Sequence, residues 1–455
     1  MGEIVVVGAG PAGIRATQTL LEAGLNPILL DEGRRPGGQG YRWIATERGL
    51  DADAVMGSEA AKYRRLHSDF TRLTSRVDYR PDTLVWGCED NRLQILQNGA
   101  ASALGFDAVV LATGAMDRVM PMPGWTLPGV FTLGGAQVVL KGQGCLIGRR
   151  VVFCGSSPLL PLAALQYLDN GAEVVAVCDT TPLSRKVGAV PPMLASAKTL
   201  VRGLGYLRKL QARGVKLMFG VEPLGVDGAE HVEGLRIRHR GLEQRLPCDA
   251  LAIGYGLKPE AQLAELLGAS MAFDPAFRLW FPRTDEDGRA AKALYLAGDG
   301  VAIGGADAAE ASGRLAALAL LADLDRPVDT AEIAGLRREI KRLRRFQHGL
   351  ARAFAWPAGA AVELAGSVAV CRCENVTAGQ IRAAMDADLG PVDLNRVKAI
   401  TRCGMGRCQG RVCGPALGEI VAAHAGRPLA EVGRLRGQAP VKPVPLRAAP
   451  AGVAS

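Results

Sequence analysis

Apolar residues in this chain gather in short runs that alternate with amphipathic stretches. Near the N-terminus the run EIVVVGAG, from Glu3, ends in glycines, and PAGIRATQTLLEAG and a second apolar run, LNPILLDEG, follow it. A short apolar run, a glycine turn, a helical period and another apolar run predict a strand–helix–strand unit. The same order recurs in RRVVFCGSSPLLPLAALQYLDNGAEVVAVCDTT, from Arg149. Such alternation is typical of doubly wound parallel sheets.

Further apolar runs indicate how the two units are nested. DAVVLATGA begins at Asp107, CDALAIGYG at Cys248 and ALYLAGDGVA at Ala293. We therefore predict an α/β fold with two nested dinucleotide-binding (Rossmann-like) domains. The predicted segments are 1–117 with 285–325 for the first domain, 118–284 for the second, 326–365 for a basic helical linker, 366–430 for a small α-rich domain and 431–455 for a tail. The Pro/Ala-rich composition of the tail predicts a segment that is flexible or lies on a partner.

Composition and charge narrow the class of protein. The 455 residues are 48% hydrophobic and contain no run close to eighteen apolar residues, so we predict several soluble domains and no transmembrane helix. The N-terminal run lacks the features of a secretory signal, which favours the cytoplasm and reduced thiols. Much of the net charge of +9 lies in LRREIKRLRRFQHGLARAF, from Leu336. No nucleic-acid-binding motif is nearby, so this segment predicts a solvated or partner-facing helix.

The first glycine turn carries a nucleotide-binding pattern. Gly8, Gly10 and Gly13 form G-x-G-x-x-G between a predicted strand and a predicted helix. Glycines at these places allow a tight turn, a close approach of the pyrophosphate and close packing of helix on sheet. Asp31 ends the next strand eighteen residues later, where an acid can bind ribose hydroxyls. The predicted contacts of the nucleotide here are Gly8, Gly10, Pro11, Ala12, Gly13, Asp31 and Glu32.

The second glycine turn departs from this pattern. Gly155 is followed by Ser157 and Leu160, where a nicotinamide site prefers glycine. Side-chain bulk at the close-approach position argues against tight NAD(P)H binding. No C-x-x-C motif accompanies the predicted nucleotide site, and we predict that the scattered thiols are core residues, namely Cys145, Cys154, Cys178 and Cys248.

Half of the ten cysteines lie close together near the C-terminal end. Cys371 and Cys373 form C-x-C, and Cys403, Cys408 and Cys413 follow in a glycine-rich stretch, all within 43 positions. Four thiolates that converge from two loops can hold zinc or an iron–sulfur cluster. The spacing lacks the C-x-x-C knuckles of a zinc ribbon, which favours the cluster. Five cysteines compete for four places, and spacing alone leaves open whether Cys403 or Cys413 is the extra one.

Three further motifs strengthen the assignment of the N-terminal part. PGGQ (36–39), LATGA (111–115) and LYLAGDGV, with Asp299, occur in this order after the glycine turn. Together the motifs resemble the flavoproteins with two dinucleotide-binding domains, the disulfide-reductase-like superfamily. The resemblance implies FAD, or in some members another adenine nucleotide, in the first site. It adds as implied contacts Gly38, Gln39, Thr113, Gly114, Gly298 and Asp299.

The cysteine segment carries a resemblance of its own. CRCENVTAGQI and TRCGMGRCQGRVC resemble the bacterioferritin-associated-ferredoxin-like [2Fe–2S] domain, with two helices between its cysteine loops. In related sequences the second loop reads T-R-X-G-M-G-X-C-Q-G-X-X-C, and the first X can be alanine. The resemblance therefore implies that Cys403 is supernumerary and that the ligands are Cys371, Cys373, Cys408 and Cys413.

Almost the whole chain resembles the FAD-binding subunits of bacterial heteromeric amino-acid and opine dehydrogenases. That group includes octopine and nopaline oxidase, D-hydroxyproline dehydrogenase, dye-linked L-proline dehydrogenase and hydrogen cyanide synthase. The resemblance implies electron transfer from a glycine-oxidase-like flavoprotein subunit, in some assemblies with a small third subunit and with FMN at the interface. The acceptor would be a quinone or respiratory chain, and the location the cytoplasm or the periphery of the inner membrane.

Two other functions compete with this one. The first is a free-standing NAD(P)H-dependent reductase that contains FAD and [2Fe–2S], and the second is a mainly structural subunit. No residue set in the chain resembles an amino-acid substrate site, so no catalytic residue is predicted, and substrate oxidation is expected in the partner.

Overall fold

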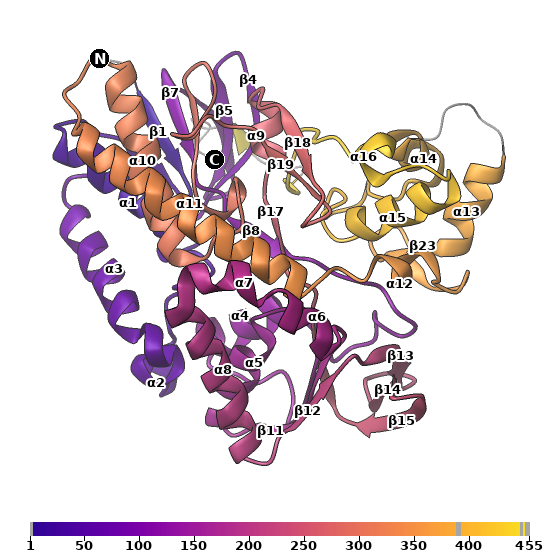
Figure 1. Ribbon diagram of the computed structural model, residues 1–455. Coiled ribbons are helices and arrows are strands. Elements are labelled where there is room, and N and C mark those ends of the chain that lie inside the picture. Colours follow the sequence, from indigo (N-terminus) through magenta and orange to yellow (C-terminus); the bar gives the residue numbers. More distant parts are fainter. Residues whose placement is uncertain (1–2, 388–392, 446–448, 451–455) are drawn as a thin grey trace.

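The computed structural model describes residues 3–387, 393–445 and 449–450. Figure 1 shows two α/β units in contact, and a smaller, mostly helical unit from the C-terminal part beside them. None of the described helices is long and apolar enough to span a bilayer. The predicted α/β fold with nested units is confirmed by the two parallel sheets described next.

The first unit has three layers. Its parallel sheet runs in the order β20-β21-β7-β1-β2-β3, with β20 antiparallel at one edge. Val5 of β1 pairs with Ile28 and Val109, and β1 is buried throughout because both faces of the sheet are covered. The strands are β1 (Ile4–Val7), β2 (Ile28–Leu30), β3 (Asp78–Arg80), β7 (Ala108–Leu111), β20 (Arg289–Ala291) and β21 (Leu294–Leu296).

Helices and a second sheet cover the two faces of this sheet. Val6 and Val110 point to the core formed with α1, α3 and α10, and Val5 and Val109 to the core formed with an antiparallel sheet. This alternation follows from the period of two in a strand. The covering elements are α1 (Pro11–Glu22), α3 (Ala60–Leu73) and α10 (Ala306–Asp323) on one face, and β4 (Thr83–Glu89), β5 (Arg92–Gln97) and β6 (Ala100–Gly105) on the other.

The second unit repeats this arrangement. Its sheet runs in the order β12-β11-β10-β16-β9, with helices on one face and the small sheet β13-β14-β15 beside the other. The strands are β9 (Val130–Thr132), β10 (Arg150–Gly155), β11 (Glu173–Asp179), β12 (Lys216–Phe219), β13 (Glu222–Asp227), β14 (Gly234–His239), β15 (Leu242–Pro247) and β16 (Ala250–Gly254), and the helices α4 (Leu133–Gln143), α5 (Leu160–Asp169) and α8 (Ala197–Ala212).

The chain returns to the first unit earlier than the predicted position 284. β17 (Leu257–Pro259) pairs with β8 (Ala115–Asp117), and α9 (Gln262–Leu266) follows at once. Leu263 of α9 lies in one core with Val5 and Leu111. The hairpin of β18 (Met271–Asp274) and β19 (Leu279–Pro282) comes next.

The predicted basic helix is α11 (Thr330–Ala353). The side chain of its N-cap, Asp329, accepts hydrogen bonds from the N–H groups of Ala331 and Glu332. Leu336, Ile340, Leu343 and Phe346 recur at helical spacing and are buried. α11 packs against α10 and against the short helices α6 (Leu183–Gly188) and α7 (Val190–Met193).

The cysteine segment folds as a small unit that is α-rich, as predicted. Two cysteines lie on the hairpin of β22 (Ala369–Cys371) and β23 (Val376–Thr377). The helices are α12 (Ala358–Val362), α13 (Ala378–Asp386), α14 (Leu394–Thr401), α15 (Gly414–His424) and α16 (Leu429–Val432). Thr377 and Gln380 form a reciprocal capping box at the start of α13.

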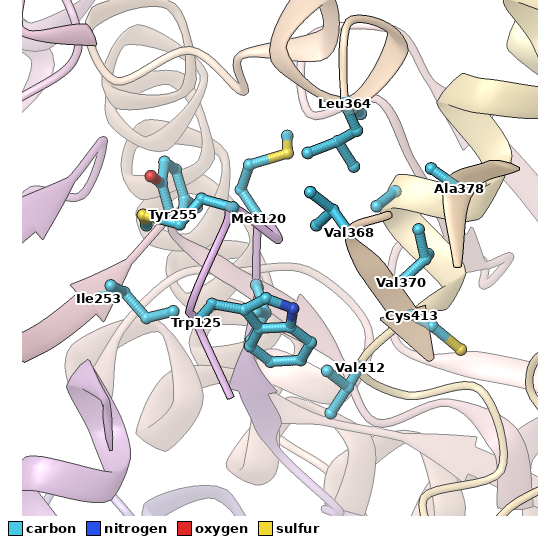
Figure 2. Close-up of a cluster of buried hydrophobic side chains, with 14 of the residues drawn as sticks. Met120, Trp125, Ile253, Tyr255, Leu364, Val368, Val370, Ala378, Val412 and Cys413 are labelled. Carbon is cyan, nitrogen blue, oxygen red and sulfur yellow. The ribbon is translucent and has the colours of Figure 1, made fainter. Parts of the chain in front are cut away.

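This small unit shares a core with the second dinucleotide-binding unit. Figure 2 shows Trp125 and Tyr255 of the second unit in one cluster with Val368, Val370 and Val412 of the cysteine segment. The Trp125 indole N–H also donates to the backbone oxygen of Ala369 at 2.7 Å. The cysteine segment is therefore packed against the second unit, and its position relative to that unit is set by buried apolar contacts.

The C-terminal segment lies on the chain itself. The Val441 N–H donates to the backbone oxygen of Trp86 in β4 at 2.8 Å, and the Val441 side chain is buried. Lys442 forms an ion pair with Glu32 of the first unit. Further on, the backbone of β24 (Ala449–Pro450) pairs with β6. The prediction of a flexible or partner-bound tail is therefore wrong for the stretch around Val441 and Lys442, because these contacts hold it on the first unit.

Candidate functional site

A cavity of about 1400 Å³ lies between the first and second units. It is larger than the 300–1,000 Å³ typical of a site for one small molecule, so a dinucleotide fits with room beside it. All the predicted nucleotide contacts except Gly13 line it, namely Gly8, Gly10, Pro11, Ala12, Asp31, Glu32, Gly38, Gln39, Thr113, Gly114, Gly298 and Asp299. The structure thus brings together residues from five separate stretches of the sequence.

The three glycines of the first turn have different reasons to be glycine. Gly8 has φ +104°, and a Cβ there would lie 2.4 Å from the backbone oxygen of Ala112. A Cβ on Gly13 would lie 1.7 Å from the backbone oxygen of Gly8, so this position requires glycine for packing of α1 on β1. Gly10 is different, because a Cβ there meets nothing closer than the Cα of Gly38, at 3.7 Å. Gly10 therefore leaves open space at the cavity wall, where a phosphate can approach the backbone.

The acids after β2 are engaged within the protein. The carboxylate of Asp31 accepts a hydrogen bond from the Ala9 N–H in the glycine turn and another from the Gly33 N–H at 2.6 Å. Burial nevertheless raises the pKa of Asp31 above its usual value. Asp31 thus connects the end of β2 to the glycine turn as well as lining the cavity, and Glu32 is paired with Lys442 at the rim.

Residues from two other motifs complete the wall. One carboxylate oxygen of Asp299 accepts from the N–H groups of Gly304 and Gly305 at 2.8 and 3.1 Å, and burial raises its pKa. Its other oxygen has no partner among the described residues, so it is free to accept a hydrogen bond from a ligand. The Thr113 hydroxyl donates to the backbone oxygen of Glu260 at 2.6 Å, which connects this motif to the residue that follows β17.

Two cationic residues at this cavity were missed by sequence reasoning. Lys141 of α4 is 4% exposed and lines the cavity, and its ammonium has no anionic or hydrogen-bonding partner among the described residues. The Nε of Arg42 is also buried without a partner, although the Arg42 Nη2 donates to Gln39 at 2.9 Å. Burial and the nearby Arg42 charge lower the pKa of Lys141 to about 8. An unpaired buried cation is unfavourable, so the presence of Lys141 at a cavity points to an anionic ligand group. No local motif marks Lys141, because its position depends on contact between the two units.

Replacing Lys141 by methionine is expected to change two properties in opposite directions. The affinity of the apoprotein for FAD should fall about 10- to 100-fold, since a hydrogen bond to a charged group contributes about 1.5–3 kcal/mol. The free energy of unfolding of the apoprotein should stay the same or rise, because an unpaired buried charge is removed. Fluorescence titration and urea unfolding measure the two quantities, and Lys292→Met, at an exposed position, is the control. Unchanged FAD affinity together with lower stability would show that Lys141 has a structural role only.

The second glycine turn also borders the cavity, but its residues differ from those of an ordinary nicotinamide site. Ser156 and Ser157 are buried where the turn enters α5. At the end of β11, Asp179 occupies the place of the ribose-binding acid, but Lys186 of α6 pairs with it at 2.7 Å. The Lys186 ammonium also lies 3.4 Å from the ring centroid of Phe354, just after α11. An acid that is already paired with a lysine is a poor ribose acceptor, which supports the prediction of weak NAD(P)H binding.

The scattered thiols are of two kinds. Cys154 and Cys178 face each other on β10 and β11 and are buried, as is Cys248. Burial raises the pKa of Cys178 to about 12 and that of Cys248 to about 11, so these thiols are unreactive. Cys145 is exposed, so its prediction as a core residue is wrong; it lies in the loop after α4, where the chain turns back toward the surface.

The five clustered cysteines come together in the small C-terminal unit. The sulfurs of Cys371, Cys403 and Cys413 lie within 4.8 Å of one another and are buried. Cys373, on the same hairpin as Cys371, is within hydrogen-bonding reach of Cys408. The loop approaches closely because Gly406 packs on Cys373, where a Cβ would lie 2.3 Å from the Cys373 Cβ. All four predicted ligands are thus neighbours, and Cys403 lies among them.

Hydrogen bonds in this cluster favour a thiolate. The Cys403 and Cys413 thiols donate to the Cys371 sulfur, which lowers the pKa of Cys371 to about 2 and raises the pKa of both donors. The backbone N–H groups of Gly404 and Glu374 also donate to Cys371. Thiols that already share protons around one thiolate are arranged to lose them to solvent when a metal binds. The geometry fits a four-thiolate centre with one thiol to spare, and it leaves both Cys403 and Cys413 close enough to serve.

A buried ion pair connects the cysteine loop to the cavity. The guanidinium of Arg411, between Cys408 and Cys413, binds Glu260 through both carboxylate oxygens, one at 2.8 Å. Burial acts to raise the pKa of Glu260, but the hydrogen bonds and charge of Arg411 lower it below its usual value. Both residues line the cavity. Gln262 adds a hydrogen bond to the backbone oxygen of Gln409 at 2.8 Å, so the cavity end and the cysteine loop are held together.

Comparison with known families assigns both parts of the chain. Residues 2–313 match the family described as pyridine nucleotide-disulphide oxidoreductase, and residues 369–423 match the BFD-like [2Fe-2S] binding domain. These matches agree with the residues that form the cavity and the cysteine cluster. The chain therefore contains a flavin domain and a [2Fe–2S] domain.

Whole-length relatives are similar to the chain from end to end. The A subunit of opine oxidase from Agrobacterium tumefaciens (strain Ach5) is 38% identical over 98% of this chain and 90% of its own length. The HcnB subunit of hydrogen cyanide synthase from Pseudomonas protegens is 31% identical over 98% of this chain and 97% of its own. Among solved structures, L-proline dehydrogenase from P. horikoshii has the same fold, with a TM-score of 0.71, 20% identity and coverage of 98% of this chain and 78% of that one.

Proposed function

Because the chain belongs to the pyridine nucleotide-disulphide oxidoreductase family, among relatives such as the A subunit of opine oxidase, we propose that it is the electron-transfer subunit of a heteromeric amine dehydrogenase. The chain is a flavin and iron–sulfur oxidoreductase subunit. In the proposed complex a glycine-oxidase-like flavoprotein subunit oxidises an opine, a D-amino acid or an imino acid. The electrons then pass through the nucleotide cavity and the cysteine centre of this chain to a quinone or respiratory acceptor.

The observation that carries the proposal is the ion pair that joins the two candidate redox sites. A flavin, when bound, exchanges electrons in pairs or singly, and a [2Fe–2S] centre exchanges one at a time. Arg411 of the cysteine loop is held by Glu260, whose backbone oxygen accepts from Thr113 at the cavity wall. The pair is mostly buried, with side-chain exposures of 8% for Arg411 and 14% for Glu260. If the cysteine loop moved away from the cavity, Glu260 would remain as a buried charge without a partner, which is unfavourable.

The altered second glycine turn supports an electron donor other than NAD(P)H. Lys186 neutralises Asp179 and Ser157 occupies the position of close approach, so the ribose of a nicotinamide nucleotide lacks a free acid there and the pyrophosphate lacks the glycine. A free-standing NAD(P)H-dependent reductase needs both. We therefore infer that electrons enter from a partner subunit. The proposed complex lies on the cytoplasmic side of the membrane and contains FMN as a further cofactor at the subunit interface.

The experiment compares two electron donors under anaerobic conditions. NADH or NADPH mixed with the purified chain is expected to leave the flavin absorbance unchanged on the timescale of turnover. Octopine or another amine substrate, mixed with the chain co-expressed with its glycine-oxidase-like neighbour, is expected to reduce both the flavin and the cluster. Absorbance follows the flavin, and electron paramagnetic resonance follows the reduced cluster.

Three outcomes separate the proposed function from its rivals. Rapid bleaching of the flavin by NADH in the isolated protein would identify a free-standing reductase. A cluster that stays oxidised while the complex turns over its amine substrate would restrict this protein to a structural role. Reduction of the cluster by the amine only when the partner is present supports the proposal.

A further inference from the structure

Exposed apolar side chains are concentrated on one short segment of the second unit. Half of the exposed large hydrophobic side chains in the described part of the chain lie between residues 183 and 204, and their exposures range from 48% to 67%. They come from α6, the 3-10 turn η3 (Leu194–Ser196) and α8, and are Leu183, Val187, Leu194, Val201 and Leu204. Single exposed apolar residues are ordinary, but a cluster of this kind marks a binding surface.

The charge of the same segment has one sign. Residues 180–221 contain eight basic and no acidic residues. Lys186, Arg202 and Arg213 are paired with acids from elsewhere in the chain. The side chains of the remaining five have no hydrogen-bond or ion-pair partner among the described residues and are exposed, namely Arg185, Lys198, Arg208, Lys209 and Lys216. These cations are therefore available to an anionic surface.

The helix α11 extends this surface. Residues 334–353 contain seven basic residues, of which Arg337 is paired with Asp287 of the first unit, and one acid, Glu339. α11 packs against α6, α7 and η3, and Met193, Phe346 and Ala353 form a buried cluster between them. In Figure 1, α11 crosses the molecule next to α6 and α7, with α8 below them. We call residues 183–216 and 334–353 together the basic apolar face.

The composition of this face distinguishes between two kinds of partner. Protein interfaces are depleted in lysine at their centres and mix charges of both signs at their rims. Segments that lie on anionic membranes combine exposed Leu and Val with Lys and Arg and lack acids. Residues 183–216 have the second composition. The rim of the nucleotide cavity lies here too, because Leu183, Val187 and Leu204 also line it.

We propose that the basic apolar face docks on an anionic phospholipid surface. The exposed leucines and valines enter the headgroup region, and the unpaired lysines and arginines bind lipid phosphates. Docking in this way turns the apolar rim of the cavity toward the bilayer, where apolar electron acceptors dissolve. The proposal concerns a surface only and does not depend on which donor reduces the chain.

The test is flotation of the purified holoprotein with lipid vesicles. The protein should bind vesicles of phosphatidylcholine mixed with phosphatidylglycerol and leave vesicles of phosphatidylcholine alone, and high salt should release it. A basic residue near an anionic surface contributes about a five-fold factor, so the combination of Lys198→Glu, Arg208→Glu and Lys209→Glu should lower the partition coefficient about 100-fold or more. The pair Leu194→Ser and Val201→Ser should lower it about 10-fold through lost apolar burial.

Matched controls lie on other surfaces. Leu242→Ser replaces a leucine that is 73% exposed on the small sheet of the second unit, and Arg149→Glu reverses an exposed charge before β10. Both should bind vesicles as the wild type does, and retained flavin and cluster absorbance shows that every variant is folded. The proposal is overturned if the wild type does not bind anionic vesicles, or if the variants of the face bind as well as the controls. Loss of a partner subunit from the variants, without vesicle binding by the wild type, would identify the face as a protein interface instead.

Discussion

Replacing Cys413 by serine is expected to remove the [2Fe–2S] cluster, whereas replacing Cys403 by serine is expected to leave it. A cluster of this type needs four thiolates. Loss of a residue that only supports a metal ligand lowers metal affinity about 10–100-fold, and loss of a ligand itself should lower it by at least as much. Cys413 precedes α15 directly, and its sulfur lies within 4.8 Å of the Cys371 sulfur. The resemblance of the loop to T-R-X-G-M-G-X-C-Q-G-X-X-C makes Cys403 the extra thiol.

Iron content and the visible spectrum of the purified variants measure this effect. Electron paramagnetic resonance after reduction by dithionite reports whether a remaining cluster keeps its electronic structure. Cys145→Ser is the matched control, since Cys145 is exposed and lies in the second unit, away from the cluster. Wild-type iron in the Cys413→Ser protein, with loss of iron in Cys403→Ser, would reverse the assignment, and the sulfur positions are compatible with that result because Cys403 also contacts Cys371.

Replacing Gly10 by valine is expected to weaken flavin binding strongly and leave the protein folded. Gly10 has φ −79° and ψ −175°, a conformation that valine readily adopts. Its Cβ would have no clash, so the added side chain would project into the space that the pyrophosphate needs. Overpacking costs about 1–3 kcal/mol, which corresponds to a rise of about 10–100-fold in the dissociation constant for FAD. Titration of the apoprotein followed by flavin fluorescence measures it.

Two further glycine variants separate binding from folding. Gly13→Val should fail to fold or lose much of its stability, because the Cβ would lie 1.7 Å from the Gly8 oxygen. Gly105→Ala on β6 should change neither property, because a Cβ there meets no atom within 4 Å. If Gly10→Val bound FAD as tightly as the wild type, the pyrophosphate would not lie against the backbone of Gly10, and the proposed role of this glycine in binding would be wrong.

Most of the nucleotide site was predictable because its parts are local. The glycine turn, the acid after the second strand and the strand that ends in Gly298 and Asp299 each occupy a few consecutive residues with their own steric requirements. The parallel arrangement of the strands then places these short motifs at one edge of the sheet. Lys141 and Arg42 show the limit of this reasoning, since a single lysine in an ordinary helix carries no sign that the opposite unit will bury it beside a cavity.

The cysteine site was predictable in kind and undecided in detail. The number of thiols and their spacing indicate a centre with four sulfur ligands. Choosing between Cys403 and Cys413 depends on how the loop folds, and the folded loop brings both to Cys371. Cys403 and Cys413 therefore remain alternatives for the fourth ligand in the folded chain, and metal binding decides between them.

The sequence by itself determined the nested α/β fold, the place of the nucleotide turn and the presence of a thiolate centre. Each follows from short-range periodicity, glycine sterics or residue chemistry. Only the tertiary structure decided that Arg411 of the cysteine loop pairs with Glu260, that Lys442 of the C-terminal segment pairs with Glu32, and that exposed leucines and cations share one face. These contacts join residues that are far apart along the chain, and their energies depend on burial that exists only after the units have packed.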